Sequence, residues 1–358
     1  MNARAHVGFG CVVLVLAGCS DPHENSGPSH EPGVPRAVRE LIDDAVANGF
    51  SGALLVTADG ERLTPEAHGL ADRDSATANT PNTAFDVGSI VKSFTATAIF
   101  RLTEDGVVTL DTTLGEIFPE VPADKTEITL RELVQHRAGF HEYHDTMGDF
   151  EPMTRLEARA KIFSQELLFP PDTDEAYSNS GYTLLADVIE TVSGERYVDF
   201  VHRELFEPAA MRSSGFYSER VWAQVDTAIG YDASTYGDND PATWPYTWAL
   251  VGNGGLVTTV GDLDRFITTL FGERIVTQAT LDVMREVYFG ADEATVDGEP
   301  VYGEAGAGDF GLGGVAVFAP ESETRVIVTT NTYEVFDIES FATDLALQLL
   351  EADRADRR

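Results

Sequence analysis

The sequence predicts an α+β domain in which both ends of the chain contribute strands to one antiparallel sheet. Near the start, a helical pattern over 38–46 precedes an apolar, β-branched run over 53–57 and the hairpin signal Asp59-Gly60. Near the end, apolar runs at 315–319 and 325–330 are joined by the turn sequence PESET and followed by a helical pattern over 337–350. Residues 86–250 carry mostly helical patterns and long loops. We therefore expect a sheet flanked by the terminal helices, with a helical region inserted in the middle.

The first residues have the features of a bacterial signal peptide. Arg4 provides a short positive segment, and residues 7–17 form an apolar run that is too short to span a bilayer. This run ends in Leu16-Ala17-Gly18-Cys19, which resembles the lipobox of bacterial lipoproteins, where the cysteine is lipidated after cleavage. The prediction is a lipoprotein signal peptide over 1–18 and a lipid anchor on Cys19 in a bacterial envelope membrane. A plain signal peptide with a chance cysteine is the alternative.

Residues 19–35 are predicted to be a flexible tether, because they are rich in Pro, Gly and polar residues and have no periodicity. The folded domain is expected over 36–352, beginning with a helix that Gly49 can end. The chain has two cysteines, Cys11 and Cys19. Because the first lies in the segment to be removed and the second would carry lipid, the processed domain would have no disulfide.

The charge balance excludes one class of function. The chain has 60 acidic and 24 basic residues, a formal net charge of −36, and its only lysines are Lys92, Lys125 and Lys161. A nucleic-acid-binding protein is nearly excluded, because phosphate contacts need a basic surface. Such an excess of carboxylates is typical of a surface that stays hydrated at high ionic strength, and an ordinary acidic protein is the alternative.

The first chemical motif is a serine followed three residues later by a lysine. Ser89 begins a helical pattern that runs to about Leu102, so Lys92 would lie one turn on, on the same face. A lysine whose pKa burial has lowered can activate such a hydroxyl as a nucleophile, beside the positive end of the helix dipole. The motif is weak alone, and a helix N-cap is the alternative role for Ser89.

The second motif is Tyr177-Ser178-Asn179, which precedes another helical pattern. A phenol near an amine can relay a proton, and a carboxamide can hold a substrate amide. A turn asparagine beside a packing tyrosine is the alternative.

Taken in this order, the motifs resemble the serine β-lactamase and penicillin-binding-protein-like family, in its branch of class C-like β-lactamases, D-alanyl-D-alanine carboxypeptidases and esterases. The resemblance covers almost all of 36–350 and includes the stretches 50–56, 83–92, 102–111, 128–139 and 254–266. It implies the β-lactamase/transpeptidase-like fold, with Ser89 as the nucleophile, Lys92 as its base and Tyr177 as the proton relay. It also implies that Asn179 contacts substrate, and it implies no metal or organic cofactor.

The third motif of that family departs from the pattern. The family places Lys-Thr-Gly or His-x-Gly on a strand that edges the site, whereas this chain has Val301-Tyr302-Gly303-Glu304-Ala305-Gly306-Ala307. Glu304 thus stands where the cation is expected, and it would raise the pKa of Lys92 and repel an anionic substrate. The backbone N–H groups of Ser89 and Ala307 are expected to form the oxyanion hole. A misplaced strand with a solvated Glu304 is the alternative.

Two further groups of residues carry weaker signals. One comprises His136, His141 and His144 with Glu142 and Asp145, which could form a metal cluster, although a polar loop is the favoured interpretation. The other comprises Trp244, Tyr246 and Trp248, which could line a pocket, although core packing is favoured because aromatic side chains bury well.

The expected function is a serine hydrolase that acts through an acyl-enzyme on a small-molecule or peptide-like ester or amide, with weak activity on anionic β-lactams. The alternative is a membrane-tethered binding or scaffold protein on the same fold, weakened as a catalyst by the loss of the third-motif cation. Intact Ser89, Lys92 and Tyr177 favour the enzyme, and Glu304 favours the binding protein.

Overall fold

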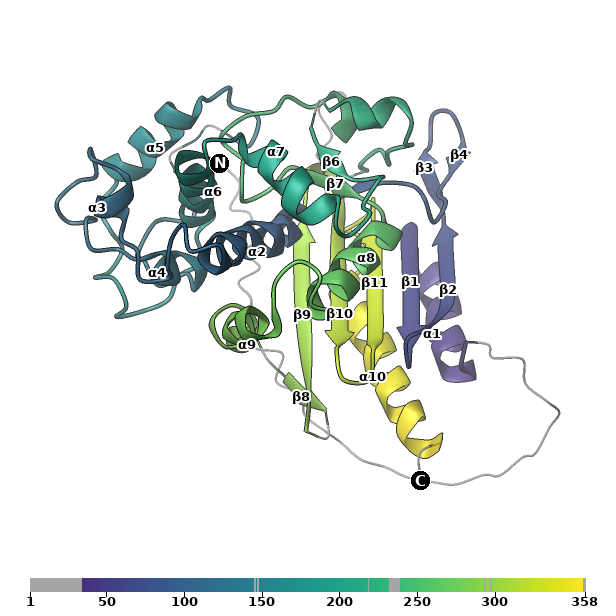
Figure 1. Cartoon of the computed structure of the whole chain (residues 1–358). Helices are drawn as coiled ribbons and strands as arrows, with labels where there is room; N and C mark the ends of the chain where they lie inside the picture. The colour runs from purple at the N-terminus through teal and green to yellow at the C-terminus, as the bar shows by residue number, and fades with distance from the viewer. Residues whose placement is uncertain are drawn as a thin grey trace.

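The two ends of the chain meet in one sheet. The computed structural model describes residues 34–356 except 145, 147, 218, 232–238, 293 and 297. In this part of the chain, six strands pair antiparallel in the order β2-β1-β11-β10-β9-β8 (Figure 1). The strand β1 pairs directly with β11, which places Leu54 opposite Val328. The strands are β1 Gly52–Ala58, β2 Glu61–His68, β8 Ala294–Val296, β9 Glu299–Ala307, β10 Gly313–Ala319 and β11 Thr324–Thr330.

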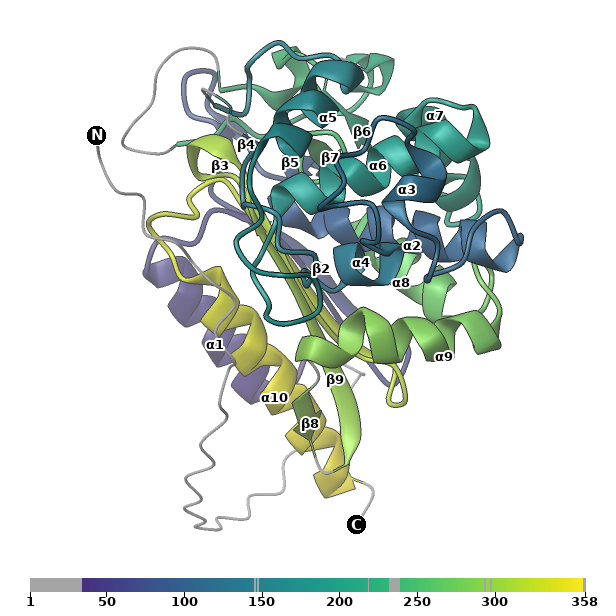
Figure 2. The ribbon, with the colours of Figure 1, turned by 90° about the vertical axis from the view of Figure 1, so that its left-hand side faces the viewer.

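Helices cover both faces of this sheet, because its central strands are apolar on both sides. On one face, α1 (Arg36–Ala47) and α10 (Ile338–Asp356) lie side by side, and Leu54 and Val328 point into the core that they cover (Figure 2). On the opposite face, α8 (Val260–Phe271) packs over β1 and β11, and Leu55 and Ile327 point into the larger core beneath it. The alternation of side chains along each strand therefore divides the protein between two cores.

The inserted region lies on the α8 side of the sheet and carries helices, turns and two small sheets (Figure 2). Its helices are α2 Val91–Glu104, α3 Leu114–Ile117, α4 Leu130–Val134, α5 Arg155–Ser164, α6 Asn179–Ser193, α7 Tyr197–Val201 and the π-helical turn η2 His202–Phe206. Its 3-10 turns are η1 Gly88–Ile90, η3 Arg220–Ala223 and η4 Pro241–Thr243. Its short strands are β3 Leu70–Asp72, β4 Thr77–Ala78, β5 Phe85–Asp86, β6 Gly215–Phe216 and β7 Leu256–Thr258. Between α8 and β10 follow α9 Gln278–Val287, η5 Phe289–Asp292 and η6 Asp309–Gly311.

This architecture confirms the predicted fold class: an antiparallel sheet, flanking terminal helices and an inserted helical region. None of the helices described is both long and apolar enough to cross a bilayer. The predicted signal peptide, most of the tether, and the lipidation site Cys19 lie outside the described residues.

The strand β9 is the part of the sheet that reaches the inserted region. The strand β8 pairs with its first three residues, and the later residues of β9 lie against η1. Gly306 makes this contact possible, because a methyl group there would lie 2.1 Å from the carbonyl oxygen of Val87 and 2.5 Å from the backbone nitrogen of Ser89. Only glycine permits this approach, and it brings the third-motif strand to the turn that carries Ser89.

Candidate active site

Ser89 lies in the 3-10 turn η1, immediately before α2, and not inside the α-helix that the sequence pattern predicted. The difference arises in the backbone. Gly88 has a φ of +51° and donates its N–H to the carboxylate of Asp86 at 2.9 Å, so the chain turns before the α-helix begins at Val91. Ile90, not Ser89, occupies the N-cap position of α2. The Ser89 hydroxyl is therefore not a helix cap, and it faces the cleft described below.

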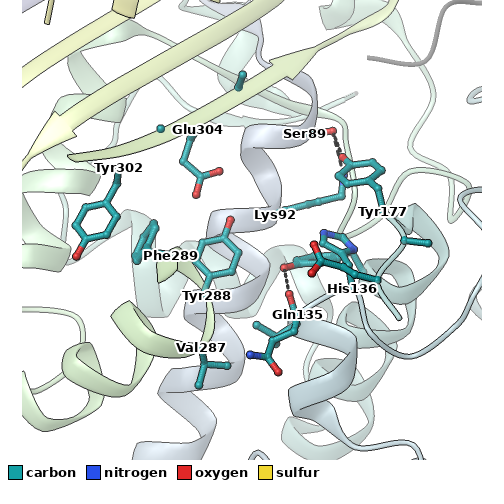
Figure 3. A pocket seen from close by; sticks show the side chains of 16 residues that line it. Ser89, Lys92, Gln135, His136, Tyr177, Val287, Tyr288, Phe289, Tyr302 and Glu304 are labelled. Atoms are coloured by element: carbon teal, nitrogen blue, oxygen red, sulfur yellow. Dashed lines mark hydrogen bonds between the residues drawn. The ribbon is translucent and has the colours of Figure 1, made fainter. Parts of the chain in front are cut away.

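Three predicted residues meet at this hydroxyl. The amine of Lys92 donates a hydrogen bond to Ser89 Oγ at 3.0 Å, and Ser89 Oγ lies 2.5 Å from the phenol oxygen of Tyr177 (Figure 3). The Lys92 side chain comes from the first turn of α2, and Tyr177 precedes α6, 88 residues after Ser89 in the chain. A hydroxyl held between an amine and a phenol has both a proton acceptor and a proton relay within hydrogen-bond distance.

The protonation of Lys92 is set mainly by burial. Its residue is 3% exposed, and burial lowers the pKa of the amine to about 7, although the charges of Glu304, Glu142 and Asp149 act in the opposite direction. The carboxylate of Glu304 therefore raises this pKa as expected, but burial outweighs it. Burial also raises the pKa of Tyr177, so the phenol stays neutral at neutral pH. A substantial fraction of Lys92 is thus available as a base near pH 7.

Tyr177 is held by the start of α6 and by His136. The hydroxyl of Ser178 caps the helix by accepting the N–H of Gly181 at 2.9 Å, and the N–H of Ser178 donates to His136 Nδ1 at 3.1 Å. The imidazole packs against the Tyr177 ring with centroids 4.8 Å apart. Burial, aided by the charge of Lys92, lowers the pKa of His136 to about 3, so this histidine is a neutral support for the phenol.

Asn253 is a site residue that sequence reasoning missed. Its carbonyl oxygen accepts a second hydrogen bond from Lys92 at 2.9 Å, and its side chain donates to Thr183 Oγ1 at 2.7 Å and to the carbonyl oxygen of Ala249 at 3.1 Å. The side chain thus fixes the backbone that orients the amine. In the sequence, the only indication of this role is that Asn253 directly precedes Gly254-Gly255.

A cleft of about 280 Å³ opens beside these groups. It is bounded by η1 and α2, the α4–α6 region, the end of α9 with the segment that follows it, and β9. The residues that line it are Ser89, Lys92, Val134, Gln135, His136, Glu175, Ala176, Tyr177, Tyr182, Val287, Tyr288, Phe289, Tyr302, Gly303, Glu304 and Ala305. Glu304 lies within β9, half-buried in this lining. The alternative of a misplaced strand with a solvated Glu304 is therefore wrong.

The other predicted substrate contacts lie at the edges of this arrangement. Asn179 is the first residue of α6 and is 8% exposed, and it is not among the residues that line the cleft. Ala307 is exposed at the end of β9, where a methyl group on Gly88 would lie 2.3 Å from its carbonyl oxygen. The backbones of Ser89 and Ala307 thus lie on adjoining segments, and the oxyanion hole formed by their N–H groups stays a prediction.

The two weaker sequence signals are placed elsewhere. His136 supports Tyr177, and His141 Nε2 lies 3.0 Å from the carbonyl oxygen of Glu166. The described residues contain no group of three or more His, Cys, Asp or Glu side chains that could hold a metal ion, and Asp145 lies outside them. Trp244 and Trp248 are buried in the core and do not line the cleft, as core packing predicted.

Asp86 supports the nucleophile turn from behind. Its carboxylate, 1% exposed, accepts the N–H of Gly88 at 2.9 Å and the hydroxyl of Tyr217 at 2.6 Å. Burial raises its pKa to about 6. A methyl group on Gly308 would lie 2.7 Å from the same carboxylate, so Asp86 also contacts the residue after Ala307.

Replacing Asp86 with alanine is expected to lower the free energy of unfolding by about 1–3 kcal/mol for each buried donor left unpaired. Asp86→Asn is the matched control and should lose less, because its amide oxygen can still accept the N–H of Gly88, whereas only the Tyr217 hydroxyl loses its acceptor. Urea denaturation of both variants measures the effect. Equal losses in the two variants would show that these hydrogen bonds do not support the turn.

Known proteins resemble this chain in sequence and in fold. A family model described as Beta-lactamase matches residues 38–349. PbpX of Bacillus subtilis (strain 168), named as a penicillin-binding protein, is 30% identical over 239 residues, 66% of this chain and 59% of PbpX. The teichoic acid D-alanine hydrolase of Staphylococcus aureus (strain MRSA252) is 26% identical over 198 residues, 55% of this chain and 48% of the hydrolase. The chain thus spans about half to six tenths of the length of these curated relatives. The octameric penicillin-binding protein homologue from Pyrococcus abyssi superimposes with a TM-score of 0.75 at 26% identity, covering 87% of this chain and 77% of that one.

Proposed function

Because the chain belongs to the Beta-lactamase family, we propose that it is a serine hydrolase that acts through an acyl-enzyme on esters or amides. One observation carries this proposal: Ser89 Oγ lies between the amine of Lys92, at 3.0 Å, and the phenol of Tyr177, at 2.5 Å. A structural serine does not need a buried lysine with a pKa of about 7 beside it.

The proposed reaction has two halves. Ser89 Oγ attacks the carbonyl carbon while its proton passes to Lys92, and backbone N–H groups of Ser89 and Ala307 stabilise the oxyanion. The tetrahedral intermediate then collapses, the leaving group departs with a proton relayed through Tyr177, and the acyl group remains on Ser89. Water attacks this ester in the second half, which releases the acid and restores the serine hydroxyl.

The negative charge of Glu304 disfavours anionic substrates. A penicillin or a peptide ending in D-alanine carries a carboxylate, and here a carboxylate lines the cleft that would receive it. We infer that β-lactamase activity is weak and that neutral or cationic esters or amides are turned over better. The relative named teichoic acid D-alanine hydrolase is consistent with hydrolysis of substrates other than β-lactams.

The second candidate function is that of a binding or scaffold protein on this fold. This alternative is favoured by Glu304, which replaces the cation expected at that position. A fluorophosphonate probe distinguishes the two candidates, because it labels only an activated serine. Covalent labelling of the wild type that is lost in Ser89→Ala supports the hydrolase. A wild type that stays unlabelled at neutral and alkaline pH, with no ester turnover, supports the binding protein.

The pH dependence should follow Lys92. Since only the neutral amine can accept the serine proton, kcat/KM for a neutral p-nitrophenyl ester is expected to rise with pH through a midpoint of about 7. In Glu304→Gln this midpoint should move to lower pH, because the carboxylate raises the pKa of Lys92. An unchanged midpoint in the variant would mean that another group controls the acid limb.

For localisation, we propose that Cys19 carries a lipid that holds the domain at a bacterial envelope membrane, with residues 19–35 as the tether. The Leu16–Cys19 sequence supports this proposal. Cys19→Ser is expected to release soluble protein or to leave an uncleaved precursor, as judged by membrane fractionation and intact mass. Cys11→Ser is the matched control and should keep the mass and fractionation of the wild type. The same wild-type behaviour in Cys19→Ser would contradict the proposal.

A further inference from the structure

We propose that the Glu304 end of the cleft binds an ammonium group of the substrate, so that the reacting ester or amide carries a cation a few atoms from its carbonyl. This inference rests on the proposed hydrolase function and names the substrate class that the site favours.

The first observation is a cluster of aromatic rings around the carboxylate. Tyr302 and Glu304 are two residues apart on β9 and therefore point to the same side of the strand, into the cleft. Tyr288 and Phe289, which follow α9, complete this end of the cleft (Figure 3). The ring centroids of Tyr288 and Phe289 are 4.8 Å apart, and those of Phe289 and Tyr302 are 5.2 Å apart.

The second observation is the charge of the cleft. The residues that line it include two carboxylates, Glu175 and Glu304, and one amine, Lys92, which is partly neutral near pH 7. Burial of Tyr288, together with the charge of Glu304 and a hydrogen bond between the two side chains, raises the pKa of the phenol, so Tyr288 is neutral. The Glu304 carboxylate can pair by charge with an organic ammonium in the cleft, whether or not that ammonium has an N–H to donate.

The third observation concerns the type of cation. A divalent metal needs several oxygen ligands, and no group of three or more such side chains occurs among the residues that the structure describes. One carboxylate beside aromatic rings suits an organic ammonium instead, because ring faces attract a weakly hydrated cation. The net charge of −36 would also raise the local concentration of a cationic substrate.

The test uses two pairs of substrates that differ only in one atom, nitrogen or carbon. For the acyl side, p-nitrophenyl 4-(trimethylammonio)butanoate is compared with p-nitrophenyl 5,5-dimethylhexanoate. For the leaving-group side, acetylthiocholine is compared with S-(3,3-dimethylbutyl) thioacetate. The ratio of kcat/KM within each pair is measured at low and high salt for the wild type and Glu304→Gln. Glu207→Gln, which removes an exposed carboxylate outside the cleft, is the matched control.

In the wild type, the cationic member of at least one pair is expected to be favoured by about 10- to 100-fold, as for opposite charges about 6 Å apart at an effective dielectric constant near 20. Glu304→Gln should remove most of that preference, leaving the smaller contribution of the aromatic rings and the net charge, and Glu207→Gln should leave the ratio unchanged. Ratios near one in the wild type, an equal ratio in Glu304→Gln, or an equal loss in Glu207→Gln would each overturn the inference.

Failure of the hydrolase proposal gives a different result. In that case neither the neutral nor the cationic esters are turned over and the fluorophosphonate probe does not label Ser89. The same four compounds are then compared by calorimetric binding to the wild type and Glu304→Gln. A preference for the ammonium members that depends on Glu304 supports the subsite without catalysis, and its absence overturns it.

Discussion

Replacing Ser89 with alanine is expected to abolish ester hydrolysis, with kcat falling by several powers of ten, because the remaining groups of such a site act as a unit around the nucleophile. Removal of the hydroxyl leaves Lys92 and Tyr177 without the atom that joins them. The measurement is the release of p-nitrophenolate from a neutral ester by purified domain. Ser164→Ala, which removes an exposed hydroxyl at the end of α5, is the matched control and should keep wild-type activity.

Lys92→Ala should also lower kcat steeply, since it removes the proton acceptor. Because Lys92 is buried, replacing it can also destabilise the fold. The melting temperatures of Ser89→Ala and Lys92→Ala therefore separate a catalytic loss from a folding defect. Wild-type turnover by folded Ser89→Ala would contradict the assignment of the nucleophile, whatever the behaviour of Lys92→Ala.

The second large effect is expected at Glu304. Two like charges about 6 Å apart at an effective dielectric constant near 20 repel by about 3 kcal/mol, or about two powers of ten in binding. Glu304→His and Glu304→Lys should therefore raise kcat/KM for nitrocefin relative to a neutral p-nitrophenyl ester by about 100-fold or more. The ratio of the two substrates is the readout, because a change in the pKa of Lys92 affects both of them.

Glu304→Gln separates repulsion from attraction in this series. It removes the negative charge without adding a positive one, so its substrate ratio should lie between those of the wild type and Glu304→Lys. Added salt should reduce the difference if the cleft is open to solvent. Efficient nitrocefin hydrolysis by the wild type, unimproved in the variants, would remove the electrostatic argument and favour an ordinary β-lactamase.

Much of the fold was predictable because its signals are local. The apolar residues of α1 recur with helical spacing, and β10 and β11 are short apolar runs on either side of a turn. These periods follow from backbone geometry and need no knowledge of partners. The pair Ser89 and Lys92 was equally predictable, because side chains three residues apart in a helical pattern lie about one turn apart on the same face.

The 3-10 turn at Ser89 was not predictable in this way. Periodicity does not distinguish the first residue of an α-helix from a turn that precedes it. The turn depends on Asp86, whose position is set by Tyr217, 131 residues further along the chain. A local pattern carries no information about such a contact.

By itself, the sequence determined the order of the elements, the serine–lysine pair and the presence of a carboxylate where the related family has a cation. The tertiary structure decided the chemistry of these groups. It brought Tyr177 to 2.5 Å from Ser89, placed the carbonyl oxygen of Asn253 on Lys92, and surrounded Glu304 with aromatic rings from the segment after α9. The physical reason is that spacing along the chain sets which side chains share a face, whereas a pKa of about 7 for Lys92 comes from burial by segments far apart in sequence.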